Sequence, residues 1–157
     1  MAWQIPVRSF SGRWALATIL GLTFCASSTS SLVPTKSDVD PRFARLERFF
    51  LLYECPAPHY VEAYLRRADD YGLDYRLLPA ISVRETQCGV YETQNNRWGY
   101  APGRRGFASV EAGIDHIARQ LTQSRAYAGK TMQQKLLIYN PKPLYPGEVI
   151  RIMRQIK

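Results

Sequence analysis

One glutamate falls on an apolar helix face, where a carboxyl group could serve as a proton donor. Leu77, Ile81 and Glu85 are spaced by four residues, so a single helix face carries all three side chains. Apolar surroundings and the negative end of the helix dipole both favour the uncharged carboxyl group, which is the form that general-acid catalysis uses. The alternatives are an ion pair between Glu85 and a base such as Arg84, or a helix that turns Glu85 outward into solvent.

The cysteines and histidines lack the spacing of a metal site. His59 and His116 are far apart in the sequence, and with Cys55 and Cys88 they do not show the ligand spacing of a zinc site. We therefore expect no metal and no cofactor. Both histidines are expected at the surface or in hydrogen bonds.

The first 28 residues have the pattern of a signal peptide. Two arginines precede the apolar stretch 14–24, and small residues follow at 26–28. We expect cleavage near residue 28 and a secreted or periplasmic protein, with an uncleaved anchor or a buried N-terminal helix as the alternative. Cys25 raises the question of a lipid anchor, but Phe24 stands where such signals carry a small residue. Residues 29–42 are predicted to be a linker.

Export and composition together restrict the class of protein and its partners. The chain of 157 residues is 46% hydrophobic and has a net charge of +8, and no apolar run is long enough to span a membrane. A basic exported protein suits an anionic partner such as a bacterial wall polymer or a membrane surface, although a solvated basic surface is the simpler interpretation. No nucleic-acid motif is visible. Cys55 and Cys88, the two cysteines left after cleavage, predict one disulfide.

Apolar residues recur at helical spacing over most of residues 43–157. Pro79 must lie in the first turn of its helix or kink it. Residues 90–108 lack a helical period and are rich in Gly and Pro, so we expect a long irregular loop there, with a short hairpin as the alternative. The fold class is mainly α, with six helices that begin near Phe43, Pro58, Asp74, Ser109, Thr131 and Pro146.

Three segments carry a resemblance to a known family. They read RETQCG at 84–89, NNRWG at 95–99 and FASVEAG at 107–113, and IYN follows at 138–140. In this order they resemble the lysozyme-like superfamily of peptidoglycan glycosidases, most of all the glucosaminidase-type domains, and the last resembles an element of lytic transglycosylases. The resemblance covers roughly residues 60–157. It implies that residues 43–157 form a lysozyme-like catalytic domain with Glu85 as the general acid.

The resemblance also implies a sugar-binding loop beside Glu85. The rings of Trp98 and Tyr100 could stack on sugars, Asn96 could bond an acetamido group, and Tyr139 could touch substrate or Glu85. Tyr91 is a further aromatic candidate in the same loop. Core packing is the alternative for each aromatic residue. Arg104 and Arg105 could meet peptide carboxylates, or simply form a solvated turn.

A second carboxylate, which glycosidases commonly use, is not evident. Glu92 is the nearest candidate, with an exposed loop acid as the alternative, and Asp69 and Asp70 are expected at the surface. The acetamido group or the muramic 6-hydroxyl of the substrate could then act as the nucleophile.

The sequence departs from both family patterns after Glu85. Residues 85–89 differ from the Glu-Ser-Gly-Trp-Gly form of glucosaminidases, and the Gly-Leu-Met-Gln stretch of soluble lytic transglycosylases is missing. A Cys55–Cys88 bridge would anchor this end of the helix. We expect a monomeric hydrolase that cleaves β-1,4 linkages in peptidoglycan glycan strands. The alternatives are a lytic transglycosylase giving 1,6-anhydro products, a non-catalytic wall-binding protein, and a basic adhesion or nucleic-acid module.

Overall fold

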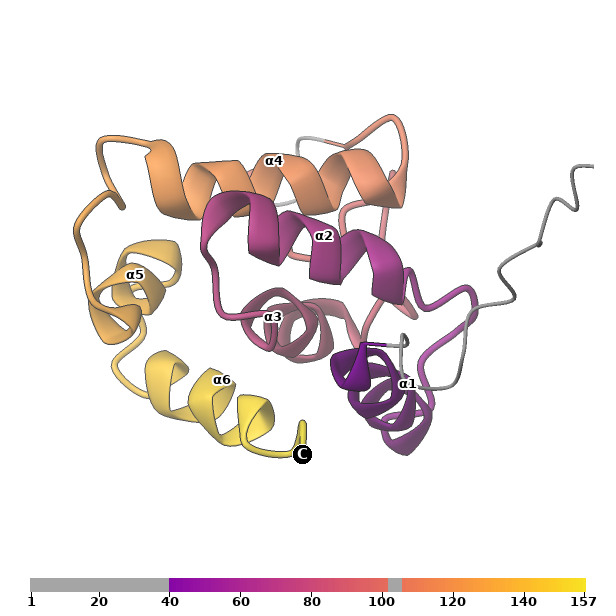
Figure 1. The fold of residues 1–157 in the computed structure, drawn as a ribbon. Coiled ribbons are helices and arrows are strands. Elements are labelled where there is room, and N and C mark those ends of the chain that lie inside the picture. The colour runs from indigo at the N-terminus through magenta and orange to yellow at the C-terminus, as the bar shows by residue number, and fades with distance from the viewer. Residues whose placement is uncertain (1–39, 102–105) are drawn as a thin grey trace, which may run out of the picture. The chain divides into compact units, whose positions relative to one another are not determined.

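The computed structural model describes residues 40–101 and 106–157, which belong to one compact unit. The predicted signal peptide, most of the predicted linker and the Arg104–Arg105 pair lie outside the described residues. Within the described part the chain is mainly α, as predicted, and contains no strand (Figure 1). Its helices are α1 (Pro41–Leu52), α2 (Val61–Tyr71), α3 (Leu77–Thr86), α4 (Val110–Gln123), α5 (Met132–Tyr139) and α6 (Tyr145–Met153).

Side-chain caps fix where several helices begin. The Ser109 side chain accepts a hydrogen bond from the backbone N–H of Ala112 and caps α4. Thr131 and Gln134 form the predicted reciprocal capping box at the start of α5. The third helix begins at Leu77, later than expected, because Asp74 binds the backbone and side chain of Arg76 in a preceding turn.

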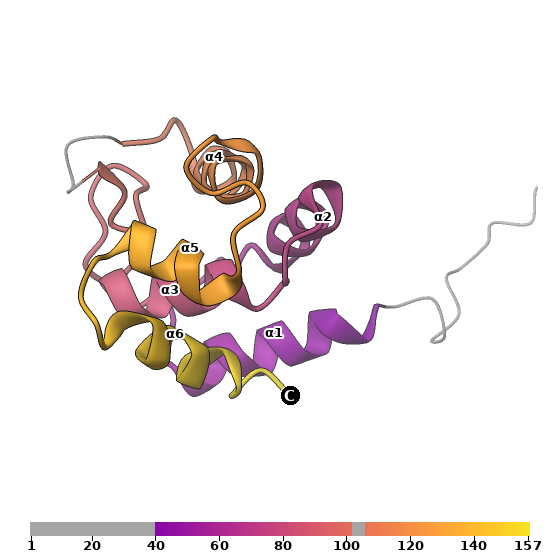
Figure 2. The same cartoon turned by 90° about the vertical axis from the view of Figure 1, so that its left-hand side faces the viewer.

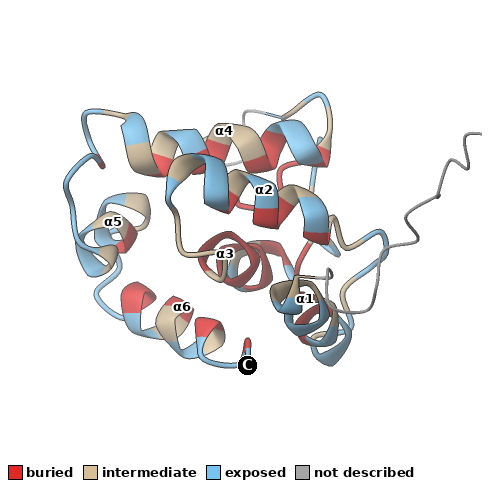
Figure 3. Ribbon diagram, viewed as in Figure 1, coloured by how far each residue is buried: buried red, intermediate tan, exposed pale blue. Residues whose placement is uncertain are grey.

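Helix α3 runs through the middle of the described unit (Figure 1), and Figure 3 shows it almost entirely buried. All seven residues from Leu77 to Val83 are buried, because helices pack against it from several sides. Its main contacts are with α6 and α4, while α2 packs on α4 and on α1. The largest fully buried side chains of the core are Trp98, Tyr64, Tyr145, Phe49, Phe50, Leu46, Leu77, Ile81, Ile114, Ile117, Leu121 and Leu136.

The predicted disulfide between Cys55 and Cys88 is present. It ties the segment after α1 to the turn that follows α3. A disulfide is consistent with an oxidising extracellular or periplasmic location. In the part of the chain that the structure describes, no helix is long and apolar enough to cross a membrane.

Gly113 allows the loop residue Trp98 to enter the core beside α4. A Cβ atom at position 113 would lie 2.4 Å from a ring carbon of Trp98 and 2.9 Å from one of Phe107. Trp98 is completely buried, and its Nε1 donates a hydrogen bond to the Leu78 carbonyl at 3.2 Å. The absence of a side chain at Gly113 therefore sets how deeply the loop packs against α3 and α4.

We expect Gly113→Ala to lower the free energy of unfolding by about 1–3 kcal/mol, because the new methyl group overpacks the Trp98 site. Gly147→Ala in α6 is the matched control, since a Cβ there meets nothing within 4 Å. The control should be neutral or more stable by up to about 1 kcal/mol, from helix propensity. Urea unfolding measures both values, and equal stability of the two variants would contradict the packing argument.

Candidate functional site

The end of α3 is fixed to the loop that follows it. Thr86 is buried, and its hydroxyl donates to the Arg97 carbonyl at 2.8 Å and accepts from the backbone N–H of Gly89 at 3.0 Å. Gln87 and Cys88 both have positive φ, and Cys88 carries the disulfide. These constraints hold the last turn of α3, which carries Glu85, against residues 95–99.

Glu85 lies between the core and the surface. The residue is partly exposed, while its Oε1 atom is buried and has no hydrogen-bond partner among the described residues. Its Oε2 atom faces Gly99, where an added Cβ would lie 3.0 Å away. Gly99 has a φ of +59°, so both its backbone conformation and its contact with the carboxylate favour glycine.

Neither alternative for Glu85 is observed. Arg84 points to α6 and pairs with Glu148 at 2.7 Å, and none of the ion pairs between described residues includes Glu85. The side chain is not turned fully into solvent either. Glu85 therefore presents a partly exposed carboxyl group that has no ion-pair partner among the described residues.

Two tyrosines border Glu85 from α5 and α6. Burial raises the pKa of Tyr145, and the adjacent Glu85 carboxylate raises it further. The Tyr145 hydroxyl faces this carboxylate without meeting strict hydrogen-bond geometry. Burial also raises the pKa of Tyr139, with Glu85 as the next cause. The rings stack at 6.2 Å, and the Tyr139 hydroxyl donates to the Trp98 carbonyl.

A pocket of about 360 Å³ opens beside this group. Gly99 and Tyr139 line it and also border Glu85, although Glu85 is not itself a lining residue. Tyrosine rings and one amide make up most of its wall, which suits a flat, hydroxyl-rich ligand. The lining residues are Gly99, Tyr100, Ala101, Tyr127, Tyr139, Asn140 and Pro141.

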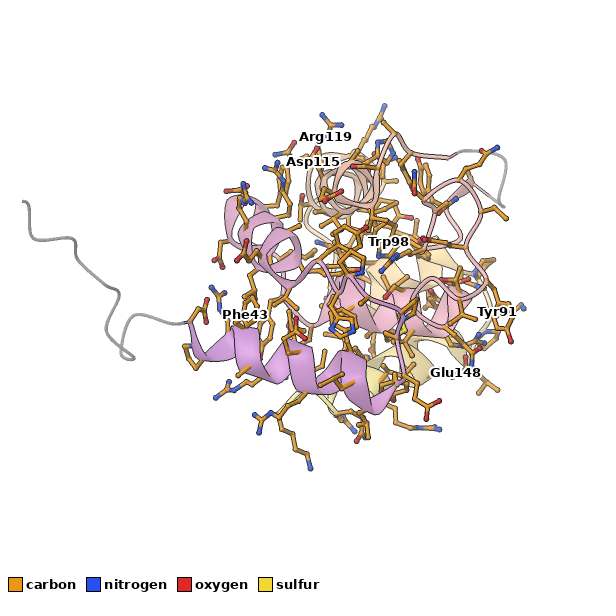
Figure 4. The ribbon with its side chains drawn as sticks, turned by 90° about the vertical axis from the view of Figure 1, so that its right-hand side faces the viewer. Phe43, Tyr91, Trp98, Asp115, Arg119 and Glu148 are labelled. Carbon is orange, nitrogen blue, oxygen red and sulfur yellow. A yellow bond between two sulfur atoms is a disulfide. The ribbon has the colours of Figure 1, made fainter. Side chains whose placement is uncertain are left out.

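The structure divides the predicted sugar-binding residues into two groups. Tyr100 and Tyr139 line the pocket. Trp98 packs in the core, as in the stated alternative, and supports Tyr139 through its carbonyl oxygen. Asn96 is buried, and its amide donates to the Tyr100 carbonyl at 2.9 Å and accepts from the Tyr100 N–H at 3.0 Å, so it shapes the loop. Tyr91 is 72% exposed and points outward, far from the buried Trp98 ring (Figure 4).

Glu92 is neither an open loop acid nor a neighbour of the pocket. Its Oε2 pairs with Nε of Arg97 at 3.0 Å, and the Arg97 side chain is only 6% exposed. The Arg97 guanidinium also lies 4.9 Å from the centre of the Tyr60 ring. A buried guanidinium without a carboxylate partner would be strongly destabilising, so we assign Glu92 the role of stabilising the loop through Arg97.

Neither histidine lines the pocket. His59 Nδ1 lies 2.7 Å from Glu47, as the hydrogen-bonding prediction requires, and the His116 ring packs against Tyr100 and Phe107. Within residues 40–101 and 106–157 no group of three His, Cys, Asp or Glu side chains is placed to hold a metal ion.

Sequence reasoning missed Tyr127 and Tyr145. Tyr127 lies in the turn after α4, and no periodic pattern marks it. Tyr145 is the first residue of α6, directly before Pro146, and it reaches Glu85 only because α6 packs on α3. The Tyr-Pro start of a helix after an irregular segment was the one available signal.

The two raised tyrosine pKa values predict a stability loss in alkali. Tyr139 and Tyr145 keep their protons in the folded state at pH values where the unfolded chain loses them, so their contribution is complete below about pH 10 and falls as the pH rises. Between about pH 10 and 11, the wild type should lose about 2 kcal/mol more of its free energy of unfolding than the variant Tyr139→Phe/Tyr145→Phe. Tyr91→Phe, which removes the hydroxyl group from an exposed ring, is the control. Chemical denaturation at both pH values measures the slopes, and identical slopes would refute the assignment.

No protein-family model, curated protein or solved structure matches this chain. The family resemblance therefore depends on the sequence segments around Glu85, the 95–99 loop and the start of α4. The structure adds that these three segments meet at one place, with the pocket beside them.

Proposed function

We propose that this protein is an exported glycoside hydrolase of the lysozyme-like fold that cleaves β-1,4 linkages in peptidoglycan, with Glu85 as its general acid. The observation that carries the proposal is the placement of Glu85. Its carboxyl group has no cationic partner among the described residues, ends a buried helix and borders a pocket walled by tyrosine rings. The proposed catalytic domain spans residues 43–157, after a signal peptide over 1–28 and a linker over 29–42.

In this mechanism Glu85 protonates the glycosidic oxygen as the bond from that oxygen to the anomeric carbon breaks. Oε2 lies beside Gly99, which lines the pocket, whereas Oε1 is buried. We assign the transferred proton to Oε2. Tyr145 and the hydrogen-bonded Tyr139 restrict the movement of the carboxyl group, so that it is held close to the reactive geometry.

The nucleophile is assigned to the substrate. Glu92, the nearest carboxylate candidate in the loop, is held by the buried Arg97. Attack by the 2-acetamido oxygen on the anomeric carbon would form a cyclic intermediate that water opens to a reducing end. Attack by the muramic 6-hydroxyl, with Glu85 taking up its proton, would give a 1,6-anhydro product, which makes a lytic transglycosylase the second candidate.

Stacking and hydrogen bonding in the pocket are assigned to residues on its wall. Tyr100 and Tyr139 provide ring faces, and the Asn140 amide nitrogen provides a donor, while its oxygen accepts from the backbone N–H of Lys142. Asn96 and Trp98 do not line the pocket. Asn96 shapes the loop, and the Trp98 carbonyl supports Tyr139.

We expect Glu85→Gln to lower lysis of purified cell wall by about 10²–10⁴-fold, because the amide cannot donate the proton at the required step. Glu62→Gln, which changes an exposed acid on α2, is the control and should retain activity. Turbidity loss measures lysis, and circular dichroism checks that both variants fold. Full lysis by folded Glu85→Gln would end the catalytic assignment.

Mass spectrometry of released fragments separates the candidates. A reducing end identifies a hydrolase, and a 1,6-anhydro end identifies a transglycosylase. Release of no soluble fragments, with retained wall binding, would favour the non-catalytic alternative. Binding that weakens steeply with salt and ignores Glu85 would favour the basic adhesion or nucleic-acid module.

Gly99→Ala tests the contact with the carboxyl group. The new Cβ would stand 3.0 Å from Oε2 of Glu85, so we expect lysis to fall by about 10-fold or more, as a displaced acid costs reactive geometry. Gly72→Ala is closely matched, since Gly72 has a φ of +60° and open space at its Cβ. Both variants carry the same backbone strain, of about 1 kcal/mol. Equal activities in the lysis assay would show that the Gly99 contact is irrelevant.

A further inference from the structure

A second surface, formed by α1 and the end of the chain, gathers basic side chains. Arg45, Arg48 and Lys157 line a pocket of about 390 Å³ together with Phe49, Leu52 and Gln155, and no acidic side chain is among these lining residues. Arg48 also donates to the main-chain oxygens of Ala44 and Lys157, at 3.3 and 3.4 Å. We call this region the α1 basic surface.

The cations of the α1 basic surface differ from half of the other arginines of the described unit. Arg42, Arg67, Arg76, Arg84 and Arg97 each pair with a carboxylate. By contrast, the ion pairs between described residues include none of the three basic side chains that line the α1 pocket.

Basic side chains outnumber acidic ones near this surface. The one acid within α1 is Glu47, which lies 2.7 Å from Nδ1 of His59, and the exposed Glu54 follows the helix. Arg151 in α6 and Arg154 directly after α6 are exposed just before the end of the chain. A positive potential therefore persists at this surface.

Two leucines project from the same end of α1. Leu51 is 65% exposed and Leu52 is 66% exposed. Arg45, Arg48 and Leu52 follow one another at spacings of three and four, so they share one helix face. Burying these leucines would be favourable in an apolar medium, whereas a hydrated polyanion would gain nothing from them.

We propose that the α1 basic surface docks on a lipid bilayer that contains anionic headgroups, with the cations at the phosphates and the two leucines in the interfacial layer. Adjacent positive charge and exposed aliphatic side chains are the combination that such an interface recognises. Figure 2 shows α1 and the end of α6 along the lower edge of the unit and residues 88–101 at the upper left. Docking through α1 would thus leave the Glu85 pocket open.

Co-sedimentation of the full chain with vesicles tests the proposal. Vesicles of phosphatidylcholine with phosphatidylglycerol should bind the wild type, and pure phosphatidylcholine vesicles should bind it much less. Arg45→Gln/Arg48→Gln should weaken the partition to anionic vesicles by about 25-fold, from about fivefold per cation. Arg119→Gln/Arg125→Gln removes the same charge from exposed positions on and after α4 and should change the partition by less than about twofold.

A leucine variant distinguishes a bilayer from a soluble polyanion. Leu51→Ser/Leu52→Ser should weaken vesicle binding by about tenfold, while Leu137→Ser/Leu144→Ser, at other exposed positions, should not. Circular dichroism confirms folding of each variant. Three results overturn the proposal: no preference for anionic vesicles, equal binding by all variants, or loss only in the arginine variant with undiminished binding by the leucine variant, which would indicate an anionic polymer as the partner.

Discussion

The hydrogen bond from Thr86 to the Arg97 carbonyl, at the point where a buried helix ends, is the constraint on which the candidate site depends. Helix α3 runs through the core, so its direction cannot change without disturbing every layer around it. Its last turn must therefore deliver Glu85 to the same place. The Thr86 bond and the disulfide at Cys88 then bring the following loop back over that turn, which sets Gly99 against the carboxyl group.

The energetics of Glu85 follow from this placement. A half-buried carboxyl group with no cation beside it is costly, and a fold usually relieves the cost with an arginine. Here Arg84 is drawn away by Glu148, and the buried Arg97 is occupied by Glu92. The groups that do face Glu85 are a glycine and two tyrosines. These ion pairs hold α3, α6 and the loop together. Glu85 is left beside the pocket without an ion pair within the described unit.

Charge is distributed unevenly over the same unit. Carboxylates pair with arginines on α2, on α3 and in the loop, whereas Arg45, Arg48 and Lys157 form no ion pair with an acidic side chain among the described residues. The chemistry of the pocket and the charge of the α1 basic surface are therefore separate properties. Under the two proposals, docking and turnover would use different faces of the protein.

The sequence by itself determined the mainly α fold, the caps at Ser109 and Thr131 and the Cys55–Cys88 bridge, since periodicity, capping patterns and cysteine number are local or countable properties. The sequence also singled out Glu85 as the candidate acid, and that assignment stays a prediction. Only the tertiary structure decided which aromatic residues face the pocket. Trp98 and Asn96 stand in the loop segment that resembles the family, yet Gly113 leaves space that draws Trp98 into the core, and Asn96 turns to its own backbone. Tyr145 reaches Glu85 across 60 residues of chain because α6 packs on α3. Contacts between distant segments depend on how helices pack, and no local pattern encodes them.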